Sequence, residues 1–433
     1  MNTVYRVLSH ITCLIFLTGF FLLPIGDIAA QEDPPIGDIE AQEDPDFSGV
    51  VIEESKEVPT PKDLDKLLTT LSLEHSKESE VKIKDIYERF SGISAAMLLS
   101  IRNVIAKNQE LINQDPETGN NCFKGFLPDV VSGSVANDFS LRTGIKLKQT
   151  ALRLRNPRNK PDLWEEKALR ILEQDGTKGE FGELTNIGGK SVYRYMKPLY
   201  MEMECLMCHS YPEVMPPKIR AYIEKNYPND NSFGYHAGVL RGGISVVIIP
   251  TKDDGNIYER FADISATMLL SIRNIIAKNQ ELINRDPETG NYYFKGAVPA
   301  VVGRSIANDF SVRTGIKLKQ TALRVRNPLN KPDLWEEKAL RILEKNKMNR
   351  GFGELTDIRG ETVYRYMKPL YMEMQCLMCH SRPEAMPSEV RKFIEGNYSS
   401  DKSLGYKAGD LRGGISVVIP IKDEFAFEFL SKK

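Results

Sequence analysis

Histidine is scarce in this chain, with five residues among 433. So few imidazoles leave no histidine-rich metal cluster and no Ser-His-Asp set that could be assembled from the sequence. The phosphate-binding pattern G-x-x-x-x-G-K is also missing. The net charge is only -1, which gives no argument for binding to nucleic acid or to an acidic surface. Beyond the N-terminus, no apolar run is long enough to cross a membrane.

Cysteine is also infrequent, but its placement is informative. Four of the six cysteines lie in two copies of the pentapeptide CLMCH, at 205–209 and 376–380. C-x-x-C-H is the attachment pattern for c-type haem, in which each thiol forms a thioether with a haem vinyl group and the histidine becomes the proximal iron ligand. We therefore predict two covalent haem c groups. The predicted attachment residues are Cys205, Cys208, Cys376 and Cys379, and the predicted axial iron ligands are His209 and His380.

Two other interpretations of the pentapeptide remain open. A zinc site needs four ligands, so the thiols of both copies would have to come together. A thioredoxin-like redox dithiol would not explain why histidine follows each pair of cysteines. Haem accounts for all three residue types, and the sequence favours it.

The pentapeptides belong to a long tandem repeat. The offset of 171 residues, from 205 to 376, holds without a gap from IYERF at 86–90 to RGGIS at 412–416, and most aligned positions are identical. A period of this length is that of an ordinary domain rather than of a solenoid unit. We therefore predict two haem domains of the same fold, at 81–251 and 252–433. The linker between them is short, so the two haems should be held in a fairly fixed relation.

The N-terminal region has the features of an export signal and a spacer. A single arginine precedes an apolar run at 11–23 that is short for a membrane span, and small residues follow it. We predict a signal peptide at 1–30 and a periplasmic or otherwise exported protein, membrane-anchored only if the signal stays uncleaved. Residues 31–80 begin with an acidic, proline-rich duplication and are predicted to form a mostly disordered tether.

Each copy has readable secondary-structure patterns. Residues 85–113 carry apolar groups at helical spacing. Asp162 and Glu165 predict a capping box at the start of a second helix. Residues 191–200 and 243–249 have strand patterns, and the pentapeptide lies between these strands. We therefore predict an α+β fold, with a long N-terminal helix and an antiparallel sheet in each domain.

Three segments together resemble a known family. The runs RNPRNKPDLWEE at 155–166, RYMKPLYMEMECLMCHSYPE at 194–213 and GYHAGVLRGGISVVI at 234–248 are similar to an exported c-type haem domain with a PAS-like fold, long catalogued as a domain of unknown function. Members serve as sensor modules, alone or on histidine kinases and chemoreceptors. The resemblance implies a haem against a PAS-like sheet, and redox or small-ligand sensing. This sequence has no kinase or methyl-accepting region after a transmembrane helix. We therefore expect a separate signalling partner, or simple electron transfer.

The sixth iron ligand decides between these functions, because two strong axial ligands favour electron transfer and an open position favours gas binding. His236 aligns with Lys407, so the second copy has no equivalent histidine. Cys122 is an odd thiol, and some members of the resembled family use a cysteine thiolate from a segment near this place. Tyr293 occupies the equivalent position in the second copy. If Cys122 or His236 contacts iron, the two haems should differ in potential.

Methionine is a further candidate for the sixth position. Met97 and Met268 are equivalent residues of the two long helices, and methionine opposite histidine raises the haem potential. For both methionines, as for the Cys122 thiol, ordinary core packing is the alternative. The other methionines near the pentapeptides are predicted to line the haem pocket.

Cationic side chains near the pentapeptides are candidates for the haem propionates. A solvated surface position is the alternative for each of them. The candidates are Arg155, Arg194 and Arg241 in the first copy and Arg326, Arg365 and Arg412 in the second.

The sequence therefore predicts an exported dihaem c-type cytochrome that acts in periplasmic electron transfer, with redox proteins as partners. The alternative is a haem-based redox or diatomic-gas sensor that signals to a separate protein. An enzyme such as a haem peroxidase has the least support, because no extra histidine or distal acid-base pair is evident. We expect no nucleic-acid partner, and a homodimer is compatible with long helices of this kind.

Overall fold

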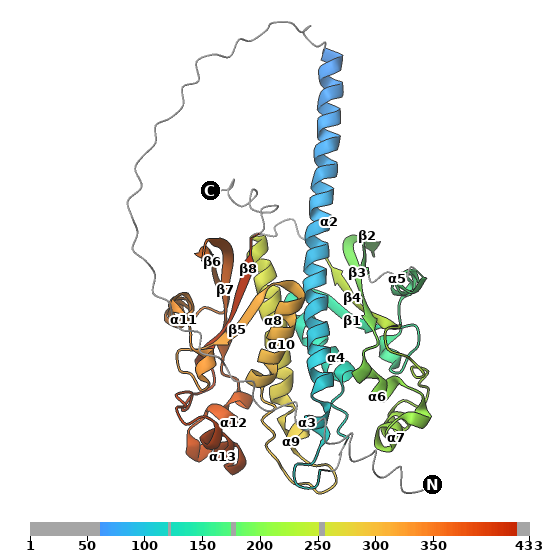
Figure 1. The fold of residues 1–433 in the computed structure, drawn as a ribbon. Helices are drawn as coiled ribbons and strands as arrows, with labels where there is room; N and C mark the ends of the chain where they lie inside the picture. Colours follow the sequence, from blue (N-terminus) through green and yellow to red (C-terminus); the bar gives the residue numbers. More distant parts are fainter. Residues whose placement is uncertain (1–60, 120–122, 175–178, 251–255, 422–433) are drawn as a thin grey trace. The chain divides into compact units, whose positions relative to one another are not determined.

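The computed structural model describes residues 61–119, 123–174, 179–250 and 256–421 (Figure 1), and side chains from residue 84 onward. Residues 67–433 form one compact unit that contains both repeats. The predicted signal peptide, the first half of the tether, Cys122 and most of the linker between the repeats lie outside the described residues.

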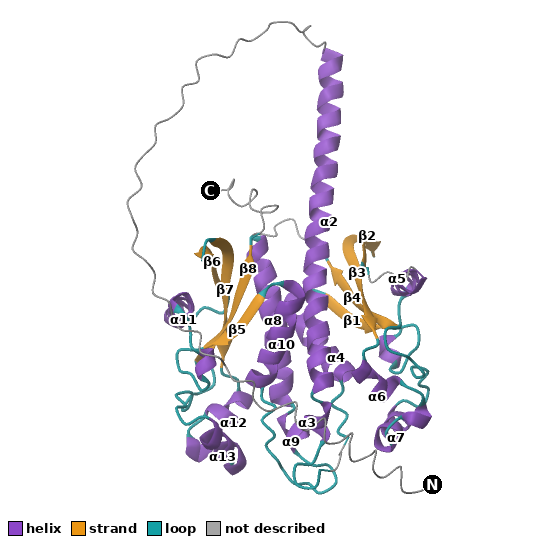
Figure 2. Cartoon of the chain, viewed as in Figure 1, coloured by secondary structure: helices purple, strands orange, loops and turns teal. Residues whose placement is uncertain are grey.

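The first repeat combines helices with four strands (Figure 2). Short 3₁₀ turns at Pro157–Asn159, Met203–Cys205 and Pro212–Val214 complete it. Its helices and strands are α2 Pro61–Lys107, α3 Gln109–Asn113, α4 Pro128–Thr143, β1 Lys146–Thr150, α5 Leu163–Gln174, β2 Phe181–Ile187, β3 Lys190–Tyr200, α6 Leu206–His209, α7 Pro217–Asn226 and β4 Leu240–Ile248.

The second repeat has the same elements in the same order. Its 3₁₀ turns lie at Pro328–Asn330, Met374–Cys376 and Pro383–Ala385. Its helices and strands are α8 Ile257–Lys278, α9 Gln280–Asn284, α10 Pro299–Thr314, β5 Lys317–Thr321, α11 Leu334–Asn346, β6 Phe352–Ile358, β7 Glu361–Tyr371, α12 Leu377–His380, α13 Ser388–Asn397 and β8 Leu411–Pro420.

Helix α2 is longer than the sequence pattern predicts. It begins at Pro61 instead of near residue 85, so residues 61–80 are helical rather than part of a tether. Proline is well tolerated in the first turn of a helix, and neither glycine nor proline interrupts the chain from residue 62 to Ser91. Leucine, lysine and glutamate predominate there, and their helix propensity is high. The tether prediction rests on the acidic, proline-rich composition that precedes this segment, although Leu64, Leu67, Leu68 and Leu71 have helical spacing.

Each repeat contains one antiparallel sheet of four strands. The strand orders are β1-β4-β3-β2 and β5-β8-β7-β6, with equivalent registers. The β3 and β4 strands predicted from the sequence are central neighbours. The chain leaves β3, forms α6 and α7, and returns in β4, so the pentapeptide lies where these two central strands are connected.

Helices cover both faces of each sheet. On one face, Tyr193 and Tyr195 of β3 are fully buried against residues of α2 and α4. On the other face, Met196 packs on Ala168 and Leu169 of α5. The predicted capping box begins α5, since the Glu165 amide donates to Asp162 at 2.8 Å and the Asp162 amide donates to Glu165 at 2.9 Å. The sequence prediction of this helix start is confirmed.

The two repeats pack against each other through equivalent residues. Phe90 of α2 stacks on its counterpart Phe261 of α8, with ring centroids 4.1 Å apart. Lys124 donates to the Ile283 carbonyl at 2.7 Å, and Lys295 donates to the Ile112 carbonyl at 3.0 Å. Reciprocal contacts of this kind are those of an isologous interface. The tandem repeat therefore builds a pseudo-two-fold interface within one chain.

The predicted fold class is confirmed: the chain is α+β, with two tandem domains that each have a helical layer and an antiparallel sheet. One hydrophobic core contains buried residues of both repeats. Among the described helices, none combines the length and the apolar character needed to span a membrane.

Candidate functional site

Each repeat has a cavity bordered by its pentapeptide. The first lies between the C-terminal part of α2, the start of α4 and α6. The second repeat has the equivalent cavity, beside α12. Each pentapeptide therefore borders a cavity of its own repeat.

The three functional residues of each pentapeptide share one cavity. Cys205, Cys208 and His209 all line the first cavity, because positions i, i+3 and i+4 lie on one side of a helical turn. Cys376, Cys379 and His380 line the second in the same way. All four thiols are free. The predicted attachment and ligand residues are therefore brought together in both repeats.

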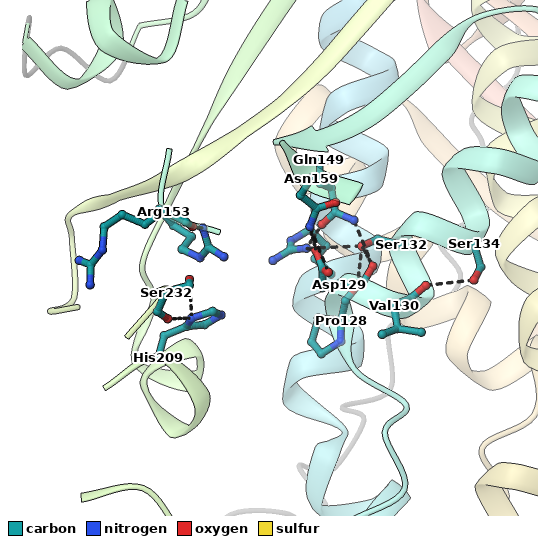
Figure 3. A network of polar contacts seen from close by, with 12 residues as sticks. Pro128, Asp129, Val130, Ser132, Ser134, Gln149, Arg153, Asn159, His209 and Ser232 are labelled. Carbon is teal, nitrogen blue, oxygen red and sulfur yellow. Dashed lines mark hydrogen bonds and ion pairs between the residues drawn. The ribbon is translucent and has the colours of Figure 1, made fainter. Parts of the chain in front are cut away.

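The loop before β4 orients the histidine of the first pentapeptide. Nδ1 of His209 lies 2.6 Å from the Ser232 carbonyl oxygen and 3.2 Å from the Ser232 hydroxyl (Figure 3). The Ser232 amide in turn donates to Asp230 at 2.7 Å. A backbone carbonyl on one ring nitrogen is the usual outer-shell partner of a metal-ligating histidine, since it selects the tautomer whose Nε2 carries the lone pair.

The second pentapeptide repeats this geometry. Nδ1 of His380 lies 2.8 Å from the Ser403 carbonyl and 3.0 Å from its hydroxyl. Burial, reinforced by the positive charges of Arg241 and Arg155, holds the pKa of His209 well below its usual value. Burial and the positive charges of Arg412, Arg326 and Arg273 do the same to the pKa of His380. Both imidazoles are therefore neutral near pH 7, the state that can donate a lone pair to iron.

These two neutral imidazoles should make the haem-free chain sensitive to acid. Below a pH of about 6.5, the ordinary histidine pKa, the unfolded chain binds a proton at each imidazole and the folded chain does not. The free energy of unfolding should then fall by up to about 1.4 kcal/mol per pH unit for each histidine. Urea denaturation between about pH 7 and 5 measures this slope. In the variant His209→Gln/His380→Gln, the free energy of unfolding should fall less steeply with decreasing pH than in wild type. The same slope in both proteins would show that the imidazoles are not buried as neutral groups.

Arg155 reaches the cavity, but its hydrogen bonds hold the pentapeptide. Its Nε donates to Asp230 at 2.9 Å and its Nη2 donates to the Cys208 carbonyl at 2.6 Å. Arg326 makes the same contacts with Asp401 and Cys379. These arginines tie the pentapeptide to the loop that orients the histidine, a role that the sequence pattern did not indicate.

Arg241 and Arg412 border their cavities at the start of β4 and β8. Arg241 donates to the Arg153 carbonyl at 3.1 Å, and Arg412 donates to the Arg324 carbonyl at 3.2 Å. The strand approaches its neighbour closely at the next residue, where a side chain on Gly242 would overlap the Thr150 carbonyl. Glycine therefore allows the arginine to sit at the cavity wall, where it can meet an anionic group.

Arg194 and Arg365 are not at the cavities, contrary to the sequence expectation. Arg194 forms an ion pair of 2.7 Å with Asp162, at the start of α5, and Arg365 forms one of 2.7 Å with Asp333, at the start of α11. Each also covers a tryptophan ring, with 4.4 Å between the guanidinium carbon and the ring centroid. Because side chains alternate along a strand, Arg194 points to the face opposite that of Tyr193 and Tyr195. This face packs on α5, away from the pentapeptide.

The candidate methionines of the long helices are also absent from the cavity walls. Met97 and Met268 are fully buried in the shared hydrophobic core, on the helix face that packs against the sheets and the other repeat. The methionines beside the pentapeptides fit the pocket-lining prediction in part, since Met203 and Met374 are largely exposed and line neither cavity. Those that line the cavities are Met201 and Met207 in the first repeat and Met372 and Met378 in the second.

The remaining sixth-ligand candidates are not placed at iron. Cys122 lies outside the described residues. Its counterpart Tyr293 does not line the second cavity, and its hydroxyl donates to Glu117 of the first repeat at 2.8 Å. His236 is exposed beside Tyr211, 6.1 Å between ring centroids, and lines a different surface hollow. In the described parts of the chain, the cavity-lining residues include no histidine other than His209 and His380.

A shared zinc site finds no support in the arrangement of the thiols. Across the described residues, no three side chains of histidine, cysteine, aspartate or glutamate come together as a metal-binding group. The thiols of the two pentapeptides belong to separate cavities. Haem is the interpretation that the geometry fits.

Sequence reasoning missed the polar wall of the first cavity (Figure 3). Asp129, Gln149 and Asn159 lie across from His209 and form a hydrogen-bonded group with Arg102. These residues come from three distant segments and carry no motif. The one available signal was a comparison of the two repeats, because Asp129 is replaced by Ala300 while the other three residues are the same in both.

Comparison with known proteins supports a relationship along both repeats. A model of the Tll0287-like family matches residues 82–250 and again 257–420. One similar solved structure is the crystal structure of the cyanobacterial heme-protein Tll0287, with 20% identity, 46% of this chain and 100% of that chain covered, and a TM-score of 0.29. At this TM-score the superposition carries no argument of its own. No curated protein matches. Because the family model covers most of both repeats, the chain belongs to the Tll0287-like family as a tandem duplication.

Proposed function

We propose that each repeat binds one haem covalently and that the protein transfers electrons. The observation that carries this proposal is the placement of two thiols and a neutral, carbonyl-oriented imidazole on one helical turn at one cavity. The matching cavity of the second repeat supports two haems per chain. The similar solved protein is itself described as a haem protein.

The residues present fit a haem at each site. Cys205 and Cys208 would form the two thioethers, and Nε2 of His209 would ligate the iron. The Arg241 guanidinium, which lines the cavity, provides a cation for a propionate. Arg155 and Ser232 keep the histidine ring oriented and the pentapeptide in place. The haem itself would supply one-electron chemistry.

Electron transfer is favoured by the rigid pairing of the two sites. The repeats share one hydrophobic core and reciprocal hydrogen bonds, so the two cavities are held in a fixed relation. A fixed distance between two redox groups suits passage of an electron from one to the other. We propose export to the periplasm and a redox protein as the partner, on the grounds of the N-terminal sequence and of covalent haem attachment.

One observation favours a sensor as the second candidate. Residues 99–107 of α2 line the first cavity, and the same helix continues without a break back to Pro61. A change at the haem could therefore be transmitted along this helix to a separate signalling protein. Carbon monoxide binding to the reduced protein distinguishes the candidates, because a sensor of diatomic gases needs an open or displaceable sixth position.

Haem attachment is tested in cells that mature c-type cytochromes. The purified chain should show Soret absorption and the mass of two covalent haems. Cys205→Ala/Cys208→Ala and Cys376→Ala/Cys379→Ala should each retain one haem and about half of the Soret absorption, because each pair of thioethers is lost separately. Met203→Ala, at an exposed residue beside the pentapeptide, is the control and should keep both haems. A chain with the bare polypeptide mass and no Soret band would rule out the proposal.

A further inference from the structure

The walls of the two cavities differ in charge at three equivalent positions. All three differences make the second cavity more positive, whereas the pentapeptides and the arginines next to them are the same in both repeats. The replacements from the first to the second repeat are Asp129 by Ala300, Gly133 by Arg304 and Glu204 by Gln375.

In the first cavity, the central cation has a counter-charge. Arg102 lies 3.6 Å from the Asp129 carboxylate and donates to Gln149 and, at 3.4 Å, to Ser132. Asn159 also donates to Asp129, at 3.2 Å. Glu202 and Glu204 border the same cavity. The positive charge of the Arg102 guanidinium is therefore balanced by a carboxylate within the protein.

In the second cavity, the equivalent Arg273 has lost both the carboxylate and the hydroxyl. Ala300 and Gly303 stand where Asp129 and Ser132 stand in the first repeat. The Arg273 Nη1 is buried without a hydrogen-bond partner, and so is the Oε1 of Gln320, the counterpart of Gln149. A buried guanidinium without a counter-charge is costly unless a ligand supplies one.

A second unpaired cation adds to this charge. Arg304 lines the second cavity and donates to the neutral Asn330 at 2.9 Å. Burial, reinforced by the positive charge of Arg412, lowers the pKa of Arg273 to about 10. Within the described part of the chain, neither Arg273 nor Arg304 forms an ion pair with a carboxylate, and no acidic residue lines this cavity.

The charge of the wall acts directly on a bound redox group. Reduction adds one electron, so a more positive surrounding favours the reduced state. At an effective dielectric constant of about 20, one unit charge about 10 Å away changes the ratio of reduced to oxidised groups by roughly tenfold. For a one-electron couple a tenfold change corresponds to about 59 mV. Three charges acting in the same direction therefore give a separation that potentiometry resolves.

We propose that the second cavity is the higher-potential site, so that an electron delivered by a redox partner passes from the first haem to the second. In this step the first iron is oxidised from Fe²⁺ to Fe³⁺ and the second is reduced from Fe³⁺ to Fe²⁺. The inference rests on the proposed function and specifies the direction of electron transfer between the two haems. It is argued from the charges of the two cavity walls, and neither Tyr293 nor His236 lines these two cavities.

The test is redox potentiometry of the haem-loaded protein and of repeat-swap variants. We expect two one-electron waves. The variant Ala300→Asp/Arg304→Gly gives the second cavity the residues of the first and should move the upper wave down by at least tenfold in the reduced-to-oxidised ratio, about 59 mV. Asp129→Ala should move the lower wave up. Raising the salt concentration should reduce these shifts, because the Asp129 side chain is 37% exposed and Arg304 is partly exposed.

A matched control changes charge away from the cavity. Arg158 is exposed, does not line the cavity, and has Leu329 as its counterpart. Arg158→Leu should leave both waves in place. Single-haem variants assign each wave to its repeat: Cys205→Ala/Cys208→Ala and Cys376→Ala/Cys379→Ala. If the single-haem variants fail to fold, the repeat-swap variants assign the waves instead.

The outcomes separate this inference from the proposed function. A protein without Soret absorption fails the haem test before any potential is measured. A protein with two haems that titrate as one wave, or an Ala300→Asp/Arg304→Gly variant that moves the lower wave, overturns the inference about direction and leaves haem binding intact.

Discussion

Replacing Arg155 by methionine should lower the free energy of unfolding by about 3–5 kcal/mol. Its guanidinium is 10% exposed and pairs with the Asp230 carboxylate, which is 7% exposed. Methionine keeps the volume of the aliphatic stem but leaves this carboxylate buried and unpaired. It also removes the hydrogen bond to the Cys208 carbonyl. Urea denaturation followed by far-UV circular dichroism measures the loss, and haem content shows whether the pentapeptide is still held for attachment.

Two further variants make this result specific. Arg158→Ala removes an exposed arginine from the same loop and should stay within about 0.5 kcal/mol of wild type. Arg155→Met/Asp230→Asn removes both charges and should cost less than Arg155→Met alone, because no buried carboxylate remains unpaired. If Arg155→Met keeps its stability and loses only haem, Arg155 is a propionate contact and not a residue that positions the pentapeptide.

Replacing Phe90 by alanine should cost about 3–5 kcal/mol and weaken both repeats together. The ring is fully buried, stacks on Phe261 with centroids 4.1 Å apart, and lies under the Arg260 guanidinium at 4.9 Å. Arg89 covers Phe261 in the equivalent way, at 5.4 Å. Since these contacts join the two repeats, thermal unfolding monitored by calorimetry should remain one transition at a lower midpoint.

A double-mutant cycle checks that the two rings act as a pair. Phe90→Ala/Phe261→Ala should destabilise the protein by less than the sum of the single changes, with a coupling of about 0.5–1.5 kcal/mol. Leu141→Ala, at a residue that is 89% exposed on α4, should have little effect. Two separate unfolding transitions in wild type, with Phe90→Ala moving only one of them, would mean that the repeats do not share a core.

The pseudo-two-fold interface has a functional consequence. A homodimer of one such domain could make the same reciprocal contacts, but its two cavities would be identical. Joined in one chain, each copy can change its own cavity wall, as the replacement of Asp129 by Ala300 shows. The tandem arrangement thus keeps the geometry of a symmetric pair and allows unequal chemistry at its two sites.

Local sequence determined much of this protein. The spacing of Cys205, Cys208 and His209 places them on one helical turn, because i, i+3 and i+4 are neighbours whatever surrounds them. The capping box of Asp162 and Glu165 and the strands at the pentapeptide followed from residues only a few positions apart. The repeat required both halves to have one fold. These features depend on covalent geometry and on hydrogen bonds between residues close in sequence, so the local sequence is enough to determine them.

Tertiary packing decided which side chains meet at the cavities. Arg155 and Arg194 are both cationic and both precede the pentapeptide, yet Arg155 borders the cavity and Arg194 faces α5. Which face of a strand packs on a helix is decided by residues far apart in the sequence. Met97 is buried in the core for the same reason. The pairing of Arg102 with Asp129 joins residues from different elements, so the unequal charge of the two cavities became visible only once the chain was folded.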